Sequence, residues 1–167
     1  MMYLVEAIKF ANTIVNSIRQ FCDKIVVVGS IRRKRVEVRD VDLVLIPKTW
    51  LWNSIVLNLK INMHATVVKA GPKLVTLKLP TGTIGETMQV DIYRASPETW
   101  GVLKLIRTGS TEHNIKLCSR ARNMGMMLSA KDGVIKDGKV IASKSETEIF
   151  KALNMEYVEP ENREVEL

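Results

Sequence analysis

The segment VVVGSIRRKRVEVRDVDLVLI, residues 26–46, constrains the fold more than any other part of the chain. It contains two short aliphatic runs that are bounded by turn-forming or charged residues, a pattern typical of buried strands. The first run, Ile25 to Val28, stops at Gly29, and the second extends from Val41 to Ile46. The pattern therefore predicts two strands that are joined by an arginine-rich connection.

The rest of residues 1–95 continues this mixture of helix and strand. Apolar residues from Leu4 to Ile18 recur at helical spacing, which predicts an amphipathic opening helix. The other predicted elements are a helix over 49–59 and strands over 65–69, 74–79 and 88–93, with a loose hairpin turn over 80–86. We interpret Trp50 and Trp52 as packing residues rather than functional ones.

The pattern changes at Ser96-Pro97, where a second half over residues 96–167 begins. A serine N-cap followed by a proline at the first helical position predicts a helix to about Arg107. Thr108-Gly109-Ser110 interrupts this helix, and a second one runs to about Met124, with Gly125 as its C-cap.

The remaining residues of this half predict two hairpin turns and a final helix. Asp132-Gly133 and Asp137-Gly138 are hairpin signals around short strands. Ser143 and Glu146 have the spacing of a capping box, which predicts a helix to about Leu153, and the tail over 156–167 is acidic. We find no repeat and no flexible linker, so the chain is predicted to form two α+β units, 1–95 and 96–167, packed closely together.

The composition limits the classes of partner and compartment. Lys and Arg number 25 against 18 Asp and Glu, which favours a polyanionic partner only weakly, because a soluble basic surface has the same balance. Cys22 and Cys118 lack metal-ligand spacing and are expected to be reduced, although a disulfide between them stays open. With no apolar run of 18 residues and no signal-peptide pattern, we expect a soluble, intracellular monomer without a membrane partner, cytoplasmic if prokaryotic or viral.

Two carboxylates stand one residue apart in the second strand of the opening segment. Residues two apart in a strand share a face at roughly 6.5–7 Å, so Asp40 and Asp42 project side by side. Their repulsion raises at least one pKa unless a cation lies between them, and hard oxygen ligands suit Mg²⁺. Upstream, Gly29-Ser30 offers a turn that can meet a phosphate, with Arg33 nearby. The alternative is a pair of solvated acids on an edge strand.

A third carboxylate, Asp91, stands in the predicted strand MQVDIY. If this strand lies beside that of Asp40 and Asp42, three carboxylates converge, as two metal ions about 3.5–4 Å apart require. Taken alone, Asp91 is equally well explained as a polar residue on a solvent face.

Several of these segments resemble the family X DNA polymerases, the DNA polymerase beta-like nucleotidyltransferases. GSIRR, DVD ten residues after Ser30, and VDI resemble the palm of this family. GVLKLIRTGSTEHNI, SRARNMGMMLSAKDGVI and SETEIFKALNMEYVEPENRE resemble its thumb. The resemblance extends over roughly residues 21–165.

The resemblance implies both a fold and an activity. The fold is α+β: a nucleotidyltransferase palm over 1–95, with a mixed or antiparallel sheet and helices on one face, then a small α/β thumb over 96–167. The implied activity is metal-dependent, template-directed DNA synthesis, which adds a deoxynucleotide to a primer 3′-hydroxyl and releases pyrophosphate, in short-gap repair. The implied partners are a dNTP and DNA, as primer-template or gapped duplex, with two Mg²⁺ ions that Mn²⁺ can replace.

The resemblance also assigns roles to individual residues. Asp40 and Asp42 would bind both metals, and Asp91 would complete the catalytic metal site and accept the primer hydroxyl proton. The implied nucleotide-binding residues are Gly29, Ser30 and Arg33 for the phosphates, Gly109 and Ser110 beside the sugar, and Asn114 in the minor groove. The expected DNA-binding residues are Lys34, Arg35, Arg39, Arg107, Lys116, Arg120 and Arg122, the first three of which fit a solvated basic face equally well. Arg32 is interpreted as a surface cation.

Departures from the family pattern leave some properties open. Leu105, Ile106 and Arg107 replace an aromatic pair before TGS, so ribonucleotide discrimination is open. The position of a template-contacting thumb arginine falls near Cys118, with Arg120 and Arg122 close by, so template fidelity is open as well. No segment corresponds to a lyase or helix-hairpin-helix region, which predicts weak, salt-sensitive DNA binding and low processivity. Two alternatives remain: a small nucleotidyltransferase that modifies RNA or protein, and a catalytically inactive DNA-binding module.

Overall fold

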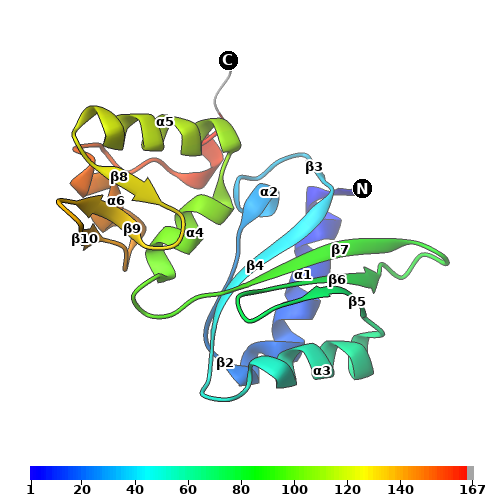
Figure 1. The fold of residues 1–167 in the computed structure, drawn as a ribbon. Coiled ribbons are helices and arrows are strands. Elements are labelled where there is room, and N and C mark those ends of the chain that lie inside the picture. The colour runs from blue at the N-terminus through cyan, green and yellow to red at the C-terminus, as the bar shows by residue number, and fades with distance from the viewer. Residues whose placement is uncertain (165–167) are drawn as a thin grey trace.

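The computed structural model describes residues 1–164, and these residues form an α+β protein with two hydrophobic cores (Figure 1). One core is built from elements within residues 1–95 and the other from elements that follow residue 100. The predicted acidic tail over 156–167 is described as far as Glu164, and its last three residues lie outside the described part.

A five-stranded mixed sheet forms the first half, with the strand order β2-β4-β7-β6-β5. β4 and β7 are parallel, the other neighbouring pairs are antiparallel, and β1 pairs with β3 in a separate short ribbon. The strands are β1 (Met2–Tyr3), β2 (Cys22–Val27), β3 (Glu37–Val38), β4 (Asp40–Pro47), β5 (Thr66–Ala70), β6 (Leu74–Pro80) and β7 (Thr87–Arg94).

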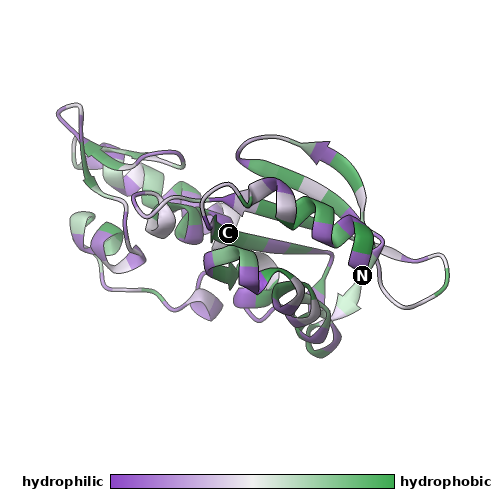
Figure 2. Ribbon diagram, turned by 90° about the horizontal axis from the view of Figure 1, so that it is seen from below, coloured by the Kyte–Doolittle hydropathy of each residue, from purple (hydrophilic) through white to green (hydrophobic). Residues whose placement is uncertain are grey.

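Two helices, α1 (Leu4–Ile18) and α3 (Trp52–Met63), cover one face of this sheet, as the resemblance implied. Their buried residues share one cluster with Leu43 of β4 and Ile92 of β7, which point to the same face. In Figure 2 a long central strand is almost entirely hydrophobic, whereas the helices carry both hydrophobic and hydrophilic residues, as amphipathic helices over a buried sheet should. The short helices η1 (Arg19–Phe21) and α2 (Gly29–Arg32) flank β2.

The second half packs against the opposite face of the sheet. Val44 and Ile46 of β4 form a small cluster there with the partly buried Trp100. The elements of this half are α4 (Trp100–Thr108), α5 (Thr111–Asn123), β8 (Met127–Ser129), β9 (Gly133–Lys136), β10 (Lys139–Ala142), α6 (Glu146–Ala152) and η2 (Pro160–Asn162). β8, β9 and β10 form an antiparallel sheet, so the two predicted Asp-Gly hairpin turns are confirmed.

The predicted starts of two helices are wrong. α3 begins at Trp52 rather than at residue 49, and α4 begins at Trp100 rather than at Pro97. The backbone N–H of Ser96 donates to Thr99 Oγ1 at 2.9 Å, so the serine closes a separate turn before the helix instead of capping it.

The predicted capping box of the last helix is displaced by two residues. Ser145 Oγ, not Ser143 Oγ, accepts the helix bond, from the backbone N–H of Glu148 at 3.1 Å. Both serines have a glutamate three residues on, so the local pattern fits either one. Ser143 is buried, and its carbonyl accepts a hydrogen bond from the backbone N–H of Val102 of α4 at 2.9 Å. Because this contact holds Ser143 against α4, Ser145 is the residue that caps α6.

Cys22 and Cys118 are free cysteines in the structure, with no disulfide between them, and their reduced state stays a prediction. Burial raises the pKa of the Cys22 thiol to about 11. Within residues 1–164 there is also no helix with the length and apolar character that crossing a membrane requires.

Candidate active site

The sheet places the three predicted carboxylates on one face. Asp40 and Asp42 lie on β4 and Asp91 lies on β7, with Asp42 directly opposite Asp91 in the parallel register. Because side chains alternate between faces along a strand, all three project away from the core residues Val41 and Leu43. The predicted adjacency of the two strands is confirmed.

The carboxylates repel one another in this arrangement. Burial, followed by the charges of Asp40 and Asp91, raises the pKa of Asp42 to about 7. Burial and the charge of Asp91 also raise the pKa of Asp40 above its ordinary value. A bound cation would relieve this repulsion, and carboxylate oxygens are the ligands that Mg²⁺ prefers. The chemistry of Asp40 and Asp42 therefore fits a divalent metal.

Asp91 is held differently from the other two carboxylates. It is 9% exposed, and its Oδ1 and Oδ2 accept hydrogen bonds from Thr76 Oγ1 at 2.5 Å and Gln89 Nε2 at 2.9 Å. Within residues 1–164, no three His, Cys, Asp or Glu side chains already stand in the geometry of a metal site. Each oxygen accepts one hydrogen bond and has a second lone pair, so Asp91 can keep both hydrogen bonds and still offer an oxygen to a metal ion.

A close approach between β4 and the turn after β2 fixes the position of Asp42. A Cβ on Gly29 would lie 2.2 Å from Asp42 Oδ2, and Gly29 has a φ of +63°. Only glycine meets both requirements, so this residue lets the carboxylate lie against the backbone of the turn. The next residue, Ser30, has a buried hydroxyl without a hydrogen-bond partner.

Asp40, Asp42 and the Gly29-Ser30 turn line a cavity of about 320 Å³ that lies between the two halves of the chain. Ser30 Oγ and Asn114 Oδ1, one from each half, are buried and unpaired among the described residues. Buried polar atoms are normally hydrogen-bonded, so these two mark unmet capacity to bind a ligand. The lining residues are Gly29, Ser30, Arg33, Asp40, Asp42, Tyr93, Ile106, Arg107, Gly109, Thr111 and Asn114.

The turn between α4 and α5 forms the second wall of this cavity. Gly109 has a φ of +71°, and a Cβ there would lie 3.1 Å from Arg33 Nη1. Asn114 is oriented by its Nδ2, which donates to Ile106 O at 2.8 Å. Ser110 does not line the cavity: its hydroxyl donates to Arg163 O at 2.6 Å and accepts from His113 N–H at 3.2 Å as the N-cap of α5.

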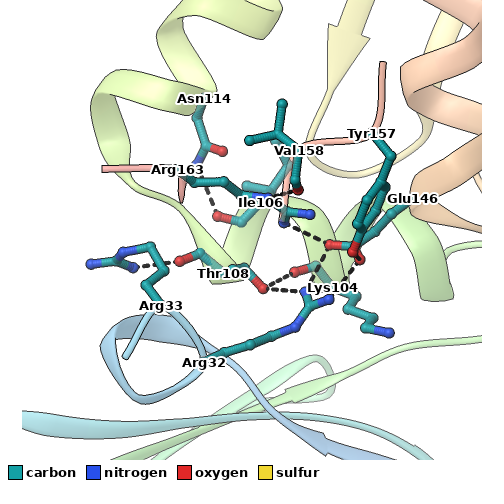
Figure 3. A network of polar contacts seen from close by, with 10 residues as sticks. All are labelled: Arg32, Arg33, Lys104, Ile106, Thr108, Asn114, Glu146, Tyr157, Val158 and Arg163. Carbon is teal, nitrogen blue, oxygen red and sulfur yellow. Dashed lines mark hydrogen bonds and ion pairs between the residues drawn. The ribbon is translucent and has the colours of Figure 1, made fainter. Parts of the chain in front are cut away.

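Arg33 reaches the cavity from α2, but its guanidinium already has protein partners. It donates to Thr108 O (Figure 3). Its Nε also donates to Glu164 Oε1 at 2.5 Å. The predicted phosphate-binding arginine is therefore ion-paired with the C-terminal segment.

The interpretation of Arg32 as a surface cation is wrong, because this side chain joins the two halves. Its two terminal nitrogens donate to the two oxygens of Glu146, each at 2.7 Å, and Nη1 also donates to Thr108 Oγ1 at 2.7 Å. Glu146 in turn accepts from the fully buried Arg163 at 2.8 Å (Figure 3). No local pattern distinguishes Arg32 from Arg33, so the sequence offered no signal for this network.

Tyr93 is a site residue that the sequence interpretation did not include. Its ring lies under the guanidinium of Arg107, 4.2 Å from the ring centroid, and both residues line the cavity. The signal was available, because Tyr93 shares the strand face of Asp91 two residues earlier. The charge of Arg107 partly offsets the rise in the pKa of Asp42 that burial and the other two carboxylates cause, which places this predicted DNA-binding residue at the carboxylates.

The structure does not gather the other predicted DNA-binding residues at the cavity. Lys34 pairs with Glu161, and Arg35 lies 3.6 Å from Glu164. Arg120 donates to the carbonyl of Leu153 at 3.0 Å and so ties α5 to the end of α6. Arg39, Lys116 and Arg122 are exposed, and none of the three forms an ion pair with another described residue.

Comparison with known families gives a match to the second half. Residues 104–164 match the family model of the DNA polymerase beta thumb. The matched segment includes the α4–α5 turn, Asn114 and Glu146, whereas β4 and β7 with the three carboxylates lie outside it. A comparison with curated proteins finds no match. The second half is therefore similar to a polymerase thumb, and the first half is described by its geometry alone.

Proposed function

We propose that this protein is a metal-dependent, template-directed DNA polymerase of the family X type. It would add a deoxynucleotide to a primer 3′-hydroxyl and release pyrophosphate, in the filling of short gaps. The observation that carries the proposal is the shared cavity: the Asp40 and Asp42 carboxylates face a turn that belongs to the segment similar to the polymerase beta thumb. The substrates would be a dNTP and primer-template or gapped DNA.

The residues of the first half have distinct roles in this proposal. Asp40 and Asp42 would hold Mg²⁺, or Mn²⁺ in its place, with Asp91 as the third carboxylate. Two bound cations supply charge neutralisation for the triphosphate and lower the pKa of the primer hydroxyl. Asp91 would accept the proton of that hydroxyl, since Thr76 and Gln89 hold its carboxylate beside Asp42.

The phosphates and the sugar would be bound at the junction of the two halves. The unpaired Ser30 hydroxyl is free to donate to a phosphate oxygen, and Arg33 adds positive charge on the same wall. The absence of a side chain at Gly109 leaves room for the sugar, and Asn114 Oδ1 is available as an acceptor. We expect the stacked pair of Tyr93 and Arg107 to decide how strictly ribose is excluded.

The substitution Asp91→Asn tests this assignment. The variant should keep its fold and bind gapped DNA normally, while single-nucleotide incorporation falls by about 10²–10⁴-fold, because a proton acceptor is lost. Incorporation is measured on gapped DNA with Mg²⁺, alongside the melting temperature. Asp23→Asn, at an exposed position on β2, is the matched control and should remain fully active. Near-normal turnover by Asp91→Asn would overturn the assignment, and a large drop in melting temperature would reveal a structural role instead.

The same assay separates the two alternative activities. Incorporation that is independent of a template would indicate a nucleotidyltransferase acting on RNA or protein. DNA binding without incorporation in either Mg²⁺ or Mn²⁺ would indicate an inactive binding module. Comparing gapped with open primers, and deoxyribose with ribose substrates, then tests the preference for short gaps and the exclusion of ribonucleotides.

A further inference from the structure

A second pocket, of about 500 Å³, adjoins the candidate active site on the side of the β5–β6 turn. It shares Tyr93 and Arg107 with the active-site cavity, and its far wall is formed by Pro72 and Arg94. Those two residues also line a third pocket, of about 640 Å³, between α3 and the β5–β6 turn. The second and third pockets therefore lie next to one another along Pro72 and Arg94, and we call these two pockets together the lateral groove.

The lateral groove is positively charged along its whole length. Arg107, Arg94 and Lys73 line its inner part, with Lys131 on the wall from the second half and Lys60 at the outer end. All five side chains belong to exposed residues, and no acidic residue lines either of the two added pockets within the described part of the chain. The row of cations therefore fits a polyanion that leaves the active-site cavity in this direction.

Two tryptophans form the outer end of the lateral groove, and only one of them packs as predicted. Trp52 is buried, and its Nε1 donates to Gly71 O at 3.1 Å, which ties α3 to the β5–β6 turn. Trp50 is 93% exposed, with a left-handed backbone φ of +68°. Neither the exposure of a whole indole nor this backbone conformation stabilises the fold. The interpretation of Trp50 as a packing residue is therefore wrong.

Arg94 connects the aromatic and the charged parts of the lateral groove. Its guanidinium lies 5.7 Å from the centroid of the Trp52 ring, and the residue lines both added pockets. Arg94 is the last residue of β7, and its backbone N–H donates to Lys73 O at 2.9 Å, so its backbone belongs to the sheet rather than to a free loop.

We propose that the lateral groove binds a single-stranded segment of nucleic acid. Its phosphates would lie along Arg94, Lys73 and Lys60, and a base would stack on the exposed indole of Trp50. A cationic groove with an aromatic platform is the arrangement that holds single strands with little sequence preference, over about 4–16 nucleotides. The site does not depend on the proposed catalysis, and during synthesis it would hold the unpaired part of the DNA substrate.

The test measures binding of a fluorescent 12-nucleotide oligo-dT by anisotropy, without metal or dNTP. Base stacking contributes about 1–3 kcal/mol, so Trp50→Ala should weaken binding roughly 5- to 150-fold. Trp50→Phe should restore part of the affinity, since it keeps a ring. Lys60→Ala should weaken binding and reduce the slope of log K against log salt by about 0.7, the value for one lost phosphate contact on a single strand.

Two substitutions serve as controls for exposure and charge. Ile84→Ala removes a fully exposed apolar side chain at the β6–β7 turn, and Lys139→Ala removes an exposed lysine on β10. Both should bind oligo-dT like the unaltered protein, and Trp50→Ala should bind a blunt duplex unchanged. Unaltered oligo-dT binding by Trp50→Ala and Lys60→Ala, or equal losses in the controls, would overturn the proposal. Asp91→Asn should bind oligo-dT normally, so failure of the polymerase assignment is distinguishable from failure of the lateral groove.

Discussion

Arg33 is the residue at which the candidate active site meets the C-terminal segment. Its side chain is 16% exposed and contacts Glu164, whose side chain is 33% exposed. A triphosphate bound in the cavity would need the same guanidinium, since a phosphate and a carboxylate accept the same donors. Glu164 therefore competes with the nucleotide for Arg33 in the proposed function.

The substitution Glu164→Gln should increase nucleotide affinity. Partly exposed ion pairs contribute about 0.2–1 kcal/mol, so the apparent Kd for a dNTP should fall by up to roughly five-fold. Isothermal titration calorimetry with Mg²⁺ and a non-hydrolysable dNTP measures this change. Glu161→Gln makes the same charge change beside the exposed Lys34 and should have a smaller effect. Equal effects would indicate bulk electrostatics, and weaker binding by Glu164→Gln would refute the competition.

At the scale of elements, the packing of α4 on the start of α6 defines the second half. A Cβ on Gly101 would lie 2.3 Å from the backbone nitrogen of Ser145, the N-cap of α6. The adjacent Val102 N–H donates to Ser143 O at 2.9 Å, so backbone meets backbone at this crossing. This contact also explains why α6 begins at the later of its two candidate caps.

The substitution Gly101→Ala should destabilise the second half. The added methyl group meets backbone rather than a flexible side chain, and overpacking of this kind costs about 1–3 kcal/mol. Urea unfolding followed by circular dichroism measures the change in the free energy of unfolding. Gly71→Ala is the matched control, because a Cβ there comes no closer than 3.4 Å to its nearest neighbour. Equal stability of the two variants would show that the α4–α6 contact adapts freely.

At the scale of the whole molecule, the network of Arg32, Glu146 and Arg163 holds the two halves together. Arg32 comes from the first half, whereas Glu146 and Arg163 come from the second. Burial alone would raise the pKa of Glu146, but the hydrogen bonds and charges of the two arginines outweigh it and lower the pKa to about 2. The packing of the two halves against each other is therefore linked to the ionisation of the Glu146 carboxylate.

This linkage predicts how stability depends on pH. A carboxylate whose pKa is lowered from 4.5 to about 2 stabilises the folded state above pH 4.5. That stabilisation, on the order of 3 kcal/mol, should disappear as the pH falls from about 4.5 to 2, because the unfolded chain binds the proton more readily. Glu146→Gln should cost about 3–5 kcal/mol at pH 7, since it leaves the buried Arg163 without its partner.

Urea unfolding at pH 7, 5, 4 and 3 tests this prediction through the difference in stability between the unaltered protein and Glu146→Gln. The difference should shrink below pH 4.5. Glu148→Gln, on the exposed side of the same helix, should show no such trend. A difference that stays constant down to pH 3 would refute the role of Glu146 ionisation.

The alternation of side chains along strands was enough to predict much of the fold and part of the candidate site. Apolar positions at helical spacing gave α1 its observed bounds, and the β4 pattern put Asp40 and Asp42 on the face opposite Val41. These predictions succeeded because periodicity is a local property that burial of one face enforces. Helix starts were less predictable. Ser96 closes a local turn before α4, and at α6 two serines fitted the capping pattern until packing selected the later one.

The sequence by itself determined which residues carry chemistry, because strand periodicity and residue type fix where a carboxylate or glycine stands on its own element. Tertiary structure alone decided which of these groups meet. It placed Asp42 beside Asp91 in the strand register. It also brought Arg32 into contact with Glu146 and Arg33 into contact with Glu164, although the two arginines are adjacent in the sequence. It also left Trp50 in solvent while burying Trp52. Contacts between residues far apart in the chain depend on how whole elements pack, and the local spacing of residue types does not specify that packing.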